Sequence, residues 1–363
     1  MASLPPTMND LFALALERGA SDLHLKAGQA PILRIAGVIA PTELASVSRQ
    51  EVLDLANQIM DAAARQEFAQ IGCADFAFMM ESGERFRVNV FRQRGCASLA
   101  ARHVSRVIPT FQELHLPVAP MERLARIPHG LVIFAGVTGS GKSTSIASCL
   151  DYINQTRRCH IITIEDPIEY VFEDKQAIIN QREVGIDVPS FGVALKYLPR
   201  EDPDVVLVGE MRDRETCESV LRAAEGTGRL VFTTLHASRA PGAITRLVDL
   251  FTDPNHHLVR QVLADNLVAV VCQKLVMCAD AEIGRIPTTE VMFATPPIRK
   301  MILEGDENGM AAVMASAGDV GMHDFTQDLA RLVREEWITP KVAYDVAPNP
   351  EALKMAIRGI TAK

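Results

Sequence analysis

The sequence lacks an apolar run long enough to span a membrane. Its longest apolar stretch covers residues 263–271 and is interrupted by Asp265 and Asn266, whereas a transmembrane helix needs about 20 consecutive apolar residues. Residues 1–10 contain neither the basic nor the apolar segment of a secretory signal. These absences predict a cytoplasmic protein that contacts a membrane only through a partner.

The chain also lacks an excess of basic residues and any closely spaced cysteine pair. It has 37 Lys and Arg against 45 Asp and Glu, and its formal net charge is −8. Non-specific nucleic-acid binding requires a basic surface, so we expect no nucleic-acid partner. None of the seven cysteines forms a C-x-x-C pair. This pattern argues against a zinc site and favours buried free thiols in a reducing compartment.

Length and composition indicate a globular protein with two domains. The chain has 363 residues, 48% hydrophobic and 23% charged, which is enough for two cores. Residues 1–107 are expected to form a small mixed α/β domain. Its helices are predicted at residues 8–18 and 50–68, and its strands at residues 21–26, 31–35, 76–80, 85–91 and 98–104.

Residues 108–130 contain four prolines and are expected to form a linker with one short helix, followed by a second domain over residues 131–363. Apolar runs predict buried strands that alternate with helices, which implies a parallel sheet with crossover helices. The strands are predicted at residues 131–135, 160–164, 205–208 and 230–234, and the helices between them at 143–154, 191–198 and 214–225. After residue 240 the chain is expected to be mostly helical, with segments at residues 244–250, 256–275, 297–303, 324–335 and 340–347.

Residues 136–143 read Gly-Val-Thr-Gly-Ser-Gly-Lys-Ser and fit the phosphate-binding pattern G-x-x-x-x-G-K-[ST]. Glycines let backbone N–H groups turn toward phosphates, and the following helix adds its N-terminal dipole. In this pattern the lysine contacts the β and γ phosphates of ATP and the last hydroxyl coordinates Mg²⁺. A chance glycine-rich turn is the alternative, and the preceding strand and following helix argue against it. The predicted nucleotide-binding positions are Gly136, Thr138, Gly139, Ser140, Gly141, Lys142, Ser143 and Thr144.

Polar residues follow three other predicted strands, at Glu165, Glu210 and His236. In parallel sheets the carboxyl ends of the strands share one edge, where ligands bind. Glu210 is expected to orient the attacking water or to support the metal. A surface glutamate after a core strand is the alternative. His236 is expected to sense the γ-phosphate or Glu210, with a histidine satisfied at a strand end as its alternative.

These segments resemble the secretion-type ATPases of type II secretion and type IV pili, in particular the pilus-retraction ATPases of the PilT and PilU type. Residues 19–25, Gly-Ala-Ser-Asp-Leu-His-Leu, resemble the N-terminal signature of the family, and residues 85–92 resemble the strand that closes its PAS-like domain. Residues 163–169, 200–213 and 234–236 are similar to its Asp box, Walker B segment and His box. The resemblance covers nearly the whole chain.

The resemblance implies a PAS-like N-terminal α/β domain, followed by a RecA-like P-loop domain with a helical C-terminal extension. It implies a homohexameric motor that hydrolyses Mg²⁺–ATP to power type IV pilus retraction and twitching motility. The implied partners are an inner-membrane pilus platform protein, which would hold the ring at the membrane periphery, and a paralogous retraction ATPase. Only Cys272 and Cys278 lie where related extension ATPases carry a tetracysteine loop, and residues 297–302 resemble the C-terminal motif of retraction ATPases.

The resemblance also assigns roles to individual residues. It places Glu165 at the metal, together with Ser143 and Glu210. It adds two arginines from the N-terminal domain, Arg87 and Arg102, which would contact phosphate; a solvated strand face is the alternative for each. The implied catalytic set is therefore Glu210, Glu165, His236, Arg87 and Arg102, and Arg200 joins the nucleotide-binding positions.

Several positions depart from the family pattern. Val137 stands where the loop usually has proline, Lys196 replaces an arginine, and Pro199 is expected to end its helix early. The turn over residues 225–229 is one residue longer than usual, and Arg229 replaces the first histidine of the His box. These departures keep a second function open, an accessory nucleotide-binding ring with weak turnover. A third, a small-molecule P-loop kinase, leaves the N-terminal domain unexplained.

Overall fold

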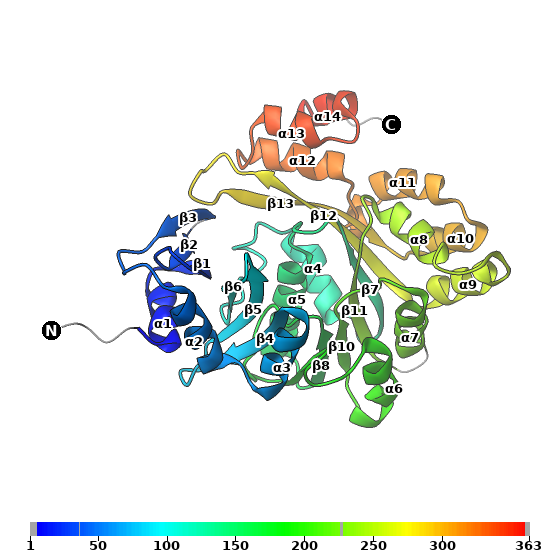
Figure 1. The fold of residues 1–363 in the computed structure, drawn as a ribbon. Helices are drawn as coiled ribbons and strands as arrows, with labels where there is room; N and C mark the ends of the chain where they lie inside the picture. Colours follow the sequence, from blue (N-terminus) through cyan, green and yellow to red (C-terminus); the bar gives the residue numbers. More distant parts are fainter. Residues whose placement is uncertain (1–5, 36, 226–227, 360–363) are drawn as a thin grey trace. The chain divides into compact units, whose positions relative to one another are not determined.

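A computed structural model describes residues 6–35, 37–225 and 228–359. The chain divides into two units (Figure 1). Unit 1 comprises Met1–Val107 and Glu169–Val171, and unit 2 comprises Ile108–Ile168 and Phe172–Lys363. Residues 226 and 227, within the turn predicted to be longer than usual, lie outside the described residues.

Unit 1 is built on a six-stranded antiparallel sheet with the strand order β3-β2-β1-β6-β5-β4. Alternate residues of its strands, such as Leu23 and Leu25 or Val88 and Val90, are buried in one core with three helices, as the two-residue period of a strand requires. The strands are β1 (Ala20–Lys26), β2 (Ile32–Ile35), β3 (Val38–Pro41), β4 (Cys73–Met79), β5 (Arg85–Gln93) and β6 (Cys96–Val104). The helices are α1 (Met8–Glu17), α2 (Arg49–Ile59) and α3 (Ala62–Ile71).

The single helix predicted over residues 50–68 is wrong, because the chain forms α2 and α3 there. Met60 adopts an extended backbone, and the side chain of Asp61 caps α3 by accepting a 2.8 Å hydrogen bond from the Ala64 N–H. Buried apolar residues continue on both sides of the break, so the hydrophobic pattern alone does not mark it. The N-cap aspartate is the local signal of the second helix.

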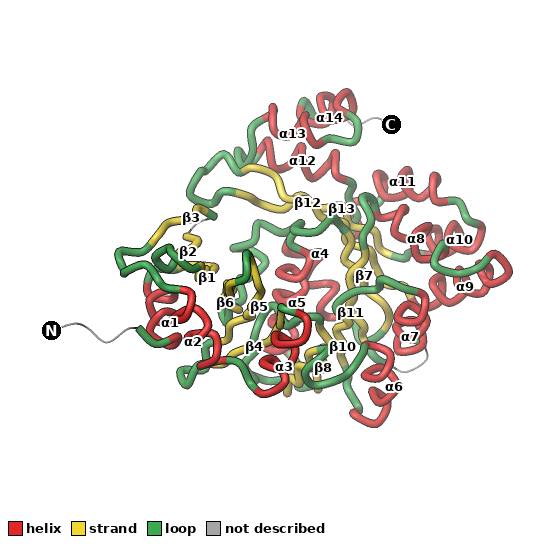
Figure 2. The backbone as a smooth tube through the Cα atoms, in the orientation of Figure 1, coloured by secondary structure: helices red, strands yellow, loops and turns green. Residues whose placement is uncertain are grey.

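Unit 2 contains a seven-stranded sheet with the order β13-β12-β7-β11-β10-β8-β9, in which only β13 is antiparallel to its neighbour. Figure 2 draws the strands in yellow and the helices in red. The central strands are buried along their whole length, as expected for parallel strands covered on both faces. The strands are β7 (Gly130–Ala135), β8 (His160–Glu165), β9 (Ile178–Glu183), β10 (Val205–Val208), β11 (Leu230–Leu235), β12 (Leu267–Met277) and β13 (Arg285–Phe293).

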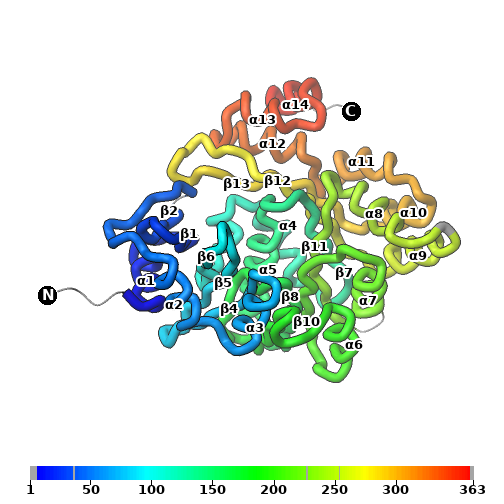
Figure 3. The backbone as a smooth tube through the Cα atoms, in the orientation of Figure 1, coloured from blue at the N-terminus to red at the C-terminus, as the bar shows by residue number. Residues whose placement is uncertain are grey.

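The helices of unit 2 follow one another along the chain between Val118 and Ile357 (Figure 3). Residues 108–130 belong to this unit, and Met121 and Leu124 of α4 are fully buried in its core. The helices are α4 (Val118–Arg126), α5 (Lys142–Thr156), α6 (Phe191–Glu201), α7 (Arg214–Ala224), α8 (Ala240–Val248), α9 (His256–Asn266), α10 (Pro296–Glu304), α11 (Glu307–Ser316), α12 (Phe325–Arg334), α13 (Pro340–Val346) and α14 (Pro350–Ile357), with short 3-10 turns η1 (Asp253–Asn255) and η2 (Gly318–Val320).

Two sequence predictions in unit 2 are wrong. The helix predicted over residues 256–275 ends at Asn266, and the chain continues as strand β12, which pairs with β7 and β13. A buried apolar run fits either structure by periodicity, and the β-branched residues of this run fit a strand. Pro199 does not end α6 early, since the helix continues to Glu201 and is terminated by the left-handed backbone of Asp202.

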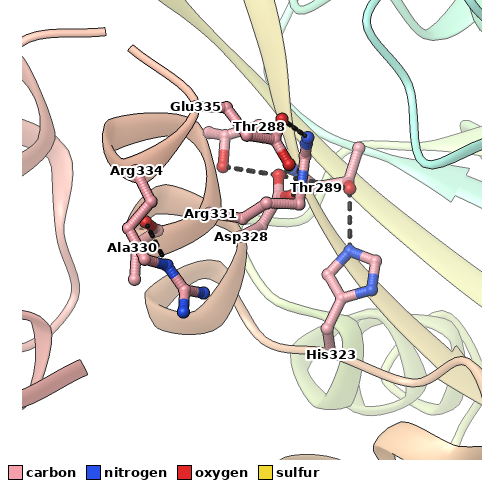
Figure 4. A network of polar contacts seen from close by, with 8 residues as sticks. All are labelled: Thr288, Thr289, His323, Asp328, Ala330, Arg331, Arg334 and Glu335. Atoms are coloured by element: carbon pink, nitrogen blue, oxygen red, sulfur yellow. Dashed lines mark hydrogen bonds and ion pairs between the residues drawn. The ribbon is translucent and has the colours of Figure 1, made fainter. Parts of the chain in front are cut away.

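A third cluster of buried residues joins α12, α13 and α14 to the ends of β12 and β13. Asp328 on α12 is 3% exposed. It accepts hydrogen bonds from the Thr289 N–H at 2.7 Å and the Thr288 hydroxyl at 3.0 Å, both on β13 (Figure 4). The Thr289 hydroxyl also contacts Nε2 of His323 at 2.9 Å, and burial lowers the pKa of that histidine. These contacts fix α12 on the sheet.

Candidate functional site

Four neighbouring parallel strands of unit 2, in the order β7-β11-β10-β8, run in the same direction. The phosphate loop follows β7, His236 follows β11, Glu210 follows β10 by two residues, and Glu165 is the last residue of β8. Because parallel strands have their carboxyl ends at one edge, the fold brings these predicted site residues to the same edge of one sheet. On this side of β7, the adjacent strand β11 leads to His236 and the next strand, β10, leads to Glu210.

The phosphate loop leaves β7 after Ala135 and enters α5 at Lys142. Gly139 and Gly141 have left-handed backbones, with φ of 76° and 86°, which residues with a Cβ rarely adopt. A Cβ on Gly136 would lie 2.5 Å from the Gln273 carbonyl oxygen, so the loop requires glycine there for close packing. No side chain caps the N-terminus of α5, and its first N–H groups therefore suit an anionic ligand.

Lys142 is folded onto its own loop. Its ammonium donates to the carbonyl oxygens of Gly136 at 2.9 Å and Val137 at 3.0 Å, and the residue is 9% exposed. The Val137 side chain, in place of the expected proline, is exposed and leaves these carbonyl contacts intact. The positive charge of Lys142 is therefore held against the loop. Phosphate oxygens can take the place of the two carbonyl oxygens as acceptors for its ammonium.

The other predicted loop residues differ in exposure. Thr138 and Gly139 are exposed, whereas Ser143 and Thr144 are half-buried in the first turn of α5. Ser140 is 2% exposed, and its hydroxyl has no hydrogen-bond partner among the described residues. The hydroxyl of Ser143 is the loop oxygen that the motif assigns to the metal.

Glu210 is held by two neighbours. Its Oε1 lies 2.8 Å from Nε2 of His236, and its Oε2 accepts from the Arg212 Nε at 2.7 Å. The hydrogen bond and charge of Glu210 raise the pKa of the Arg212 guanidinium. These two contacts fix the orientation of the Glu210 carboxylate. The first joins it to His236, the residue that follows the neighbouring strand β11.

Glu165 is 8% exposed. Its Oε1 accepts from the Thr163 hydroxyl at 2.6 Å and from Gln181 Nε2 at 3.3 Å. The ends of β8 and β10 are in close contact, because the Gly209 N–H donates to the Ile164 carbonyl at 2.8 Å. In the part of the chain that the structure describes, no group of three or more His, Cys, Asp and Glu side chains is placed to hold a metal ion.

The arginines implied by the resemblance lie on other elements. Arg87 on β5 and Arg102 on β6 are directly opposite each other in the sheet of unit 1. Arg102 donates to Asp22, and Arg87 to Asp75, each at 2.8 Å. Arg200 is exposed on α6, with its guanidinium 5.7 Å from the ring centre of Tyr197, and no described contact joins it to the phosphate loop.

One residue that contacts the phosphate loop was missed from the sequence. Gln273 on β12 is 2% exposed and donates from Nε2 to the carbonyl oxygen of Ser140 at 2.7 Å. No local motif marks this glutamine, and its strand was predicted as a helix. The signal that the sequence does carry is a lone amide within an apolar run, which needs a buried partner when the run forms a core strand.

Comparison with known proteins identifies the family. The model of a family described as type II/IV secretion system protein matches residues 1–306. The chain belongs to this family. It is 40% identical to the type IV pilus retraction ATPase PilT of Pseudomonas aeruginosa over 344 residues, which cover 95% of this chain and 99% of that protein. It is 37% identical to the type IV pilus ATPase PilU of the same organism, over 96% of this chain and 90% of that protein.

A solved structure supports the same assignment. A crystal structure of the pilus retraction motor PilT with bound ADP is similar with a TM-score of 0.89 and 41% identity, covering 96% of this chain and 99% of that one. The predicted resemblance to secretion-type ATPases and the predicted mixed α/β fold class are confirmed, and so is the ATPase assignment. The phosphate loop and this ADP-bound relative together support nucleotide binding in the family member described here.

Proposed function

We propose that this protein is an ATPase motor that hydrolyses Mg²⁺–ATP to power type IV pilus retraction. One observation carries the proposal: the phosphate loop, Glu210, His236 and Glu165 follow four neighbouring parallel strands at one sheet edge. The named functions of the relatives, a pilus retraction ATPase and a pilus retraction motor, supply the biological output.

The residues present fit a nucleotide with its metal. Gly139 and Gly141 have left-handed backbones, and the N-terminus of α5 has no side-chain cap, so its first N–H groups suit phosphate oxygens. Mg²⁺ prefers oxygen ligands and is usually held by one or two protein groups together with substrate phosphates. Ser143, Glu165 and Glu210 supply such oxygens without forming a cage on their own. This donor set suits a metal that arrives with ATP.

We assign the following roles within unit 2. Lys142 exchanges its contacts with the loop carbonyls for the β and γ phosphates, and the loop amides bind the same groups. Glu210, oriented by His236 and Arg212, accepts a hydrogen bond from the attacking water and directs it at the γ-phosphorus. Mg²⁺, when bound, neutralises charge that develops on the phosphate oxygens. Glu165 orients ligands of the metal through its fixed carboxylate.

Unit 1 contributes arginines in this proposal. Arg87 and Arg102 form a pair of guanidinium groups on adjacent strands, and guanidinium forks suit bidentate phosphate contacts. We propose that they stabilise the charge of the transition state, and that residues 1–107 act as the PAS-like N-terminal domain. Arg200 is assigned to nucleotide binding on the resemblance alone, since its described contact is with Tyr197.

The proposed assembly is a homohexameric ring in the cytoplasm that docks on an inner-membrane pilus platform protein and works with a paralogous ATPase. The relatives named for type IV pili support the pilus partner. Among the described residues no helix has the length and apolar character needed to cross a bilayer. Attachment through a platform protein is consistent with that finding.

The second function is an accessory nucleotide-binding ring with weak turnover. The 37% identity to PilU, together with the departures at Lys196, Pro199 and Arg229, motivates it. Arg229 donates from Nε to the Pro203 carbonyl at 3.1 Å, a contact between the segments that precede β11 and β10.

Phosphate release separates the two functions. Purified protein is assayed at saturating Mg²⁺–ATP without any added phosphate acceptor, beside the Glu210→Gln variant. The motor requires turnover at least about 100-fold above that variant, since loss of a general base costs two orders of magnitude or more. ATP binding by both proteins is measured beside turnover, so that a loss of hydrolysis is separated from a loss of binding. Equal turnover in the two proteins would falsify the motor proposal.

A further inference from the structure

Gln273 lies where β12 passes the start of the phosphate loop. The parallel pairing of β12 with β7 ends at the partners Cys272 and Ala135, so Gln273 and Gly136 are the next residues on the two chains. The carbonyl oxygen of Gln273 would lie 2.5 Å from a Cβ at position 136. The strand and the loop are therefore in direct contact here, and glycine makes that contact sterically allowed.

The Gln273 side chain makes two buried hydrogen bonds to opposite ends of the loop–helix junction. Its Nε2 donates to the Ser140 carbonyl at 2.7 Å, and its Oε1 accepts from the Ser145 hydroxyl at 2.8 Å. Ser145 is 1% exposed and lies one turn into α5. One end of the amide donates to a carbonyl and the other accepts from a hydroxyl, which fixes its orientation.

The contact with Ser140 determines how the next peptide group is oriented. In a planar trans peptide, the carbonyl of one residue and the N–H of the following residue point in opposite directions. Because the Ser140 carbonyl is directed at Gln273, the Gly141 N–H is directed away from β12. Gly141 is the N-cap of α5, where backbone N–H groups bind anions.

We propose that Gln273 is a positioning residue for phosphate binding, which holds the Ser140–Gly141 peptide in its binding orientation before nucleotide arrives. This inference rests on the proposed function, because it assumes that the loop binds phosphates. A donor that is already oriented binds an anion without the cost of reorganisation. Without the glutamine, the Ser140 carbonyl loses a buried partner and the peptide is free to rotate.

The close approach at Gly141 supports a specific fit. A Cβ there would lie 2.7 Å from Nε2 of Gln273, so the amide occupies space that only a glycine at position 141 leaves free. Glycine is therefore needed at position 141 for two reasons. Its backbone is left-handed, and a Cβ would collide with the amide of Gln273. A glutamine that only filled the core could donate to any buried acceptor, whereas this one donates to the carbonyl that precedes the N-cap of α5.

The test uses two substitutions at one position. Gln273→Met fills similar space without hydrogen bonds, and Gln273→Leu also removes both hydrogen bonds without adding a charge. ADP affinity of the purified full chain is measured by isothermal titration calorimetry, and thermal unfolding is measured without nucleotide. We expect each variant to weaken ADP binding about tenfold, as removal of groups that orient ligand contacts does. Each should still unfold cooperatively, at a temperature lowered by a few degrees because the Ser140 carbonyl loses a buried partner.

Matched variants separate this role from general packing. Lys274→Met changes the next residue of β12, whose ammonium lies 4.4 Å from the ring centre of Phe325, and should leave ADP affinity within about twofold. Ser145→Ala removes only the Oε1 contact and should weaken binding less than either substitution of Gln273.

Two results contradict different parts of the account. ADP binding by both Gln273 variants within about twofold of the wild type would overturn the positioning role. If Lys142→Ala abolishes binding in the same titration, the proposed nucleotide site still stands. If Lys142→Ala binds ADP as well as the wild type does, the proposed function itself fails. Should Gln273→Met not fold, Gln273→Leu, which likewise lacks both hydrogen bonds and adds no charge, gives the same comparison.

Discussion

Arg102 and Arg87 are neighbours on the sheet of unit 1 but are held by different kinds of contact. Asp22 is 8% exposed and accepts from the Nε of Arg102, whose side chain remains 70% exposed. Arg87 instead uses its terminal Nη2 to contact Asp75, and both members of that pair are nearly half exposed. Exposed ion pairs contribute little energy. Asp22 therefore anchors Arg102 through its inner nitrogen while the terminal nitrogens face solvent.

This difference predicts unequal effects of two aspartate substitutions. Asp22→Asn should lower kcat for ATP hydrolysis about tenfold, because the guanidinium proposed to contact phosphate loses its fixed orientation. Steady-state phosphate release measures the effect, and the unchanged KM for ATP distinguishes it from a loss of binding by the loop.

Asp75→Asn is the matched control, since it removes the exposed partner of the neighbouring arginine. It should keep kcat within about twofold of the wild type. Equal losses in the two variants would show that Asp22 has no special relation to Arg102. Normal turnover in Arg102→Ala would instead remove this arginine from the proposed site.

At the scale of elements, the contact between α12 and β13 holds the C-terminal helices on the sheet of unit 2. Asp328 accepts from two groups on β13 and also pairs with Arg331 of its own helix at 2.8 Å (Figure 4). A buried backbone N–H that loses its acceptor costs about 1–3 kcal/mol. The Thr289 N–H depends on Asp328 for this partner.

Asp328→Ala should therefore lower the free energy of unfolding of the C-terminal cluster by about 3 kcal/mol. The single tryptophan of the chain, Trp337, packs against this cluster, so its fluorescence during urea denaturation reports on the right element. Asp345→Ala, at an exposed position of α13, is the control and should change little. The same midpoint for both variants would contradict the role given to Asp328.

The elements that could be predicted are those whose signals are local. The loop motif, the strand before it and the helix after it lie together in sequence, so β7 and α5 follow from residues 130–156 alone. Strand β12 could not be identified in this way, because its apolar run fits a helix or a strand until its neighbours are known. The position of Gln273 beside Ser140 depends on that pairing, across 133 residues of sequence.

The break between α2 and α3 and the course of α6 show a different limit. Asp61 is a local signal for the start of α3. The hydrophobic pattern continues across the break between α2 and α3 and does not show where the second helix begins. Pro199 lies near the C-terminal end of α6 and has no backbone N–H to donate. The helix tolerates this loss and continues for two more residues, to Glu201. Helix propensity and hydrophobic pattern describe the average behaviour of residues. The tertiary packing of each segment decides where a particular helix begins and ends.

At the scale of the whole molecule, two units with separate cores are joined in one chain. The residues proposed for catalysis are divided between these units, with the loop and acids in unit 2 and Arg87 and Arg102 in unit 1. A motor built in this way can couple nucleotide state to domain movement, since hinge motions accompany ligand binding in many enzymes. We propose that this movement, repeated around a ring, extracts pilin from the fibre.

The central claim is tested most directly by counting surface pili in cells that lack this protein. Electron microscopy compares a deletion strain with strains that carry the wild-type chain or Glu210→Gln in its place. The account predicts excess pili and reduced twitching motility in the deletion strain and with Glu210→Gln, and normal piliation with the wild-type chain. An absence of pili in the deletion strain, or unchanged piliation with unchanged motility, would contradict a retraction motor.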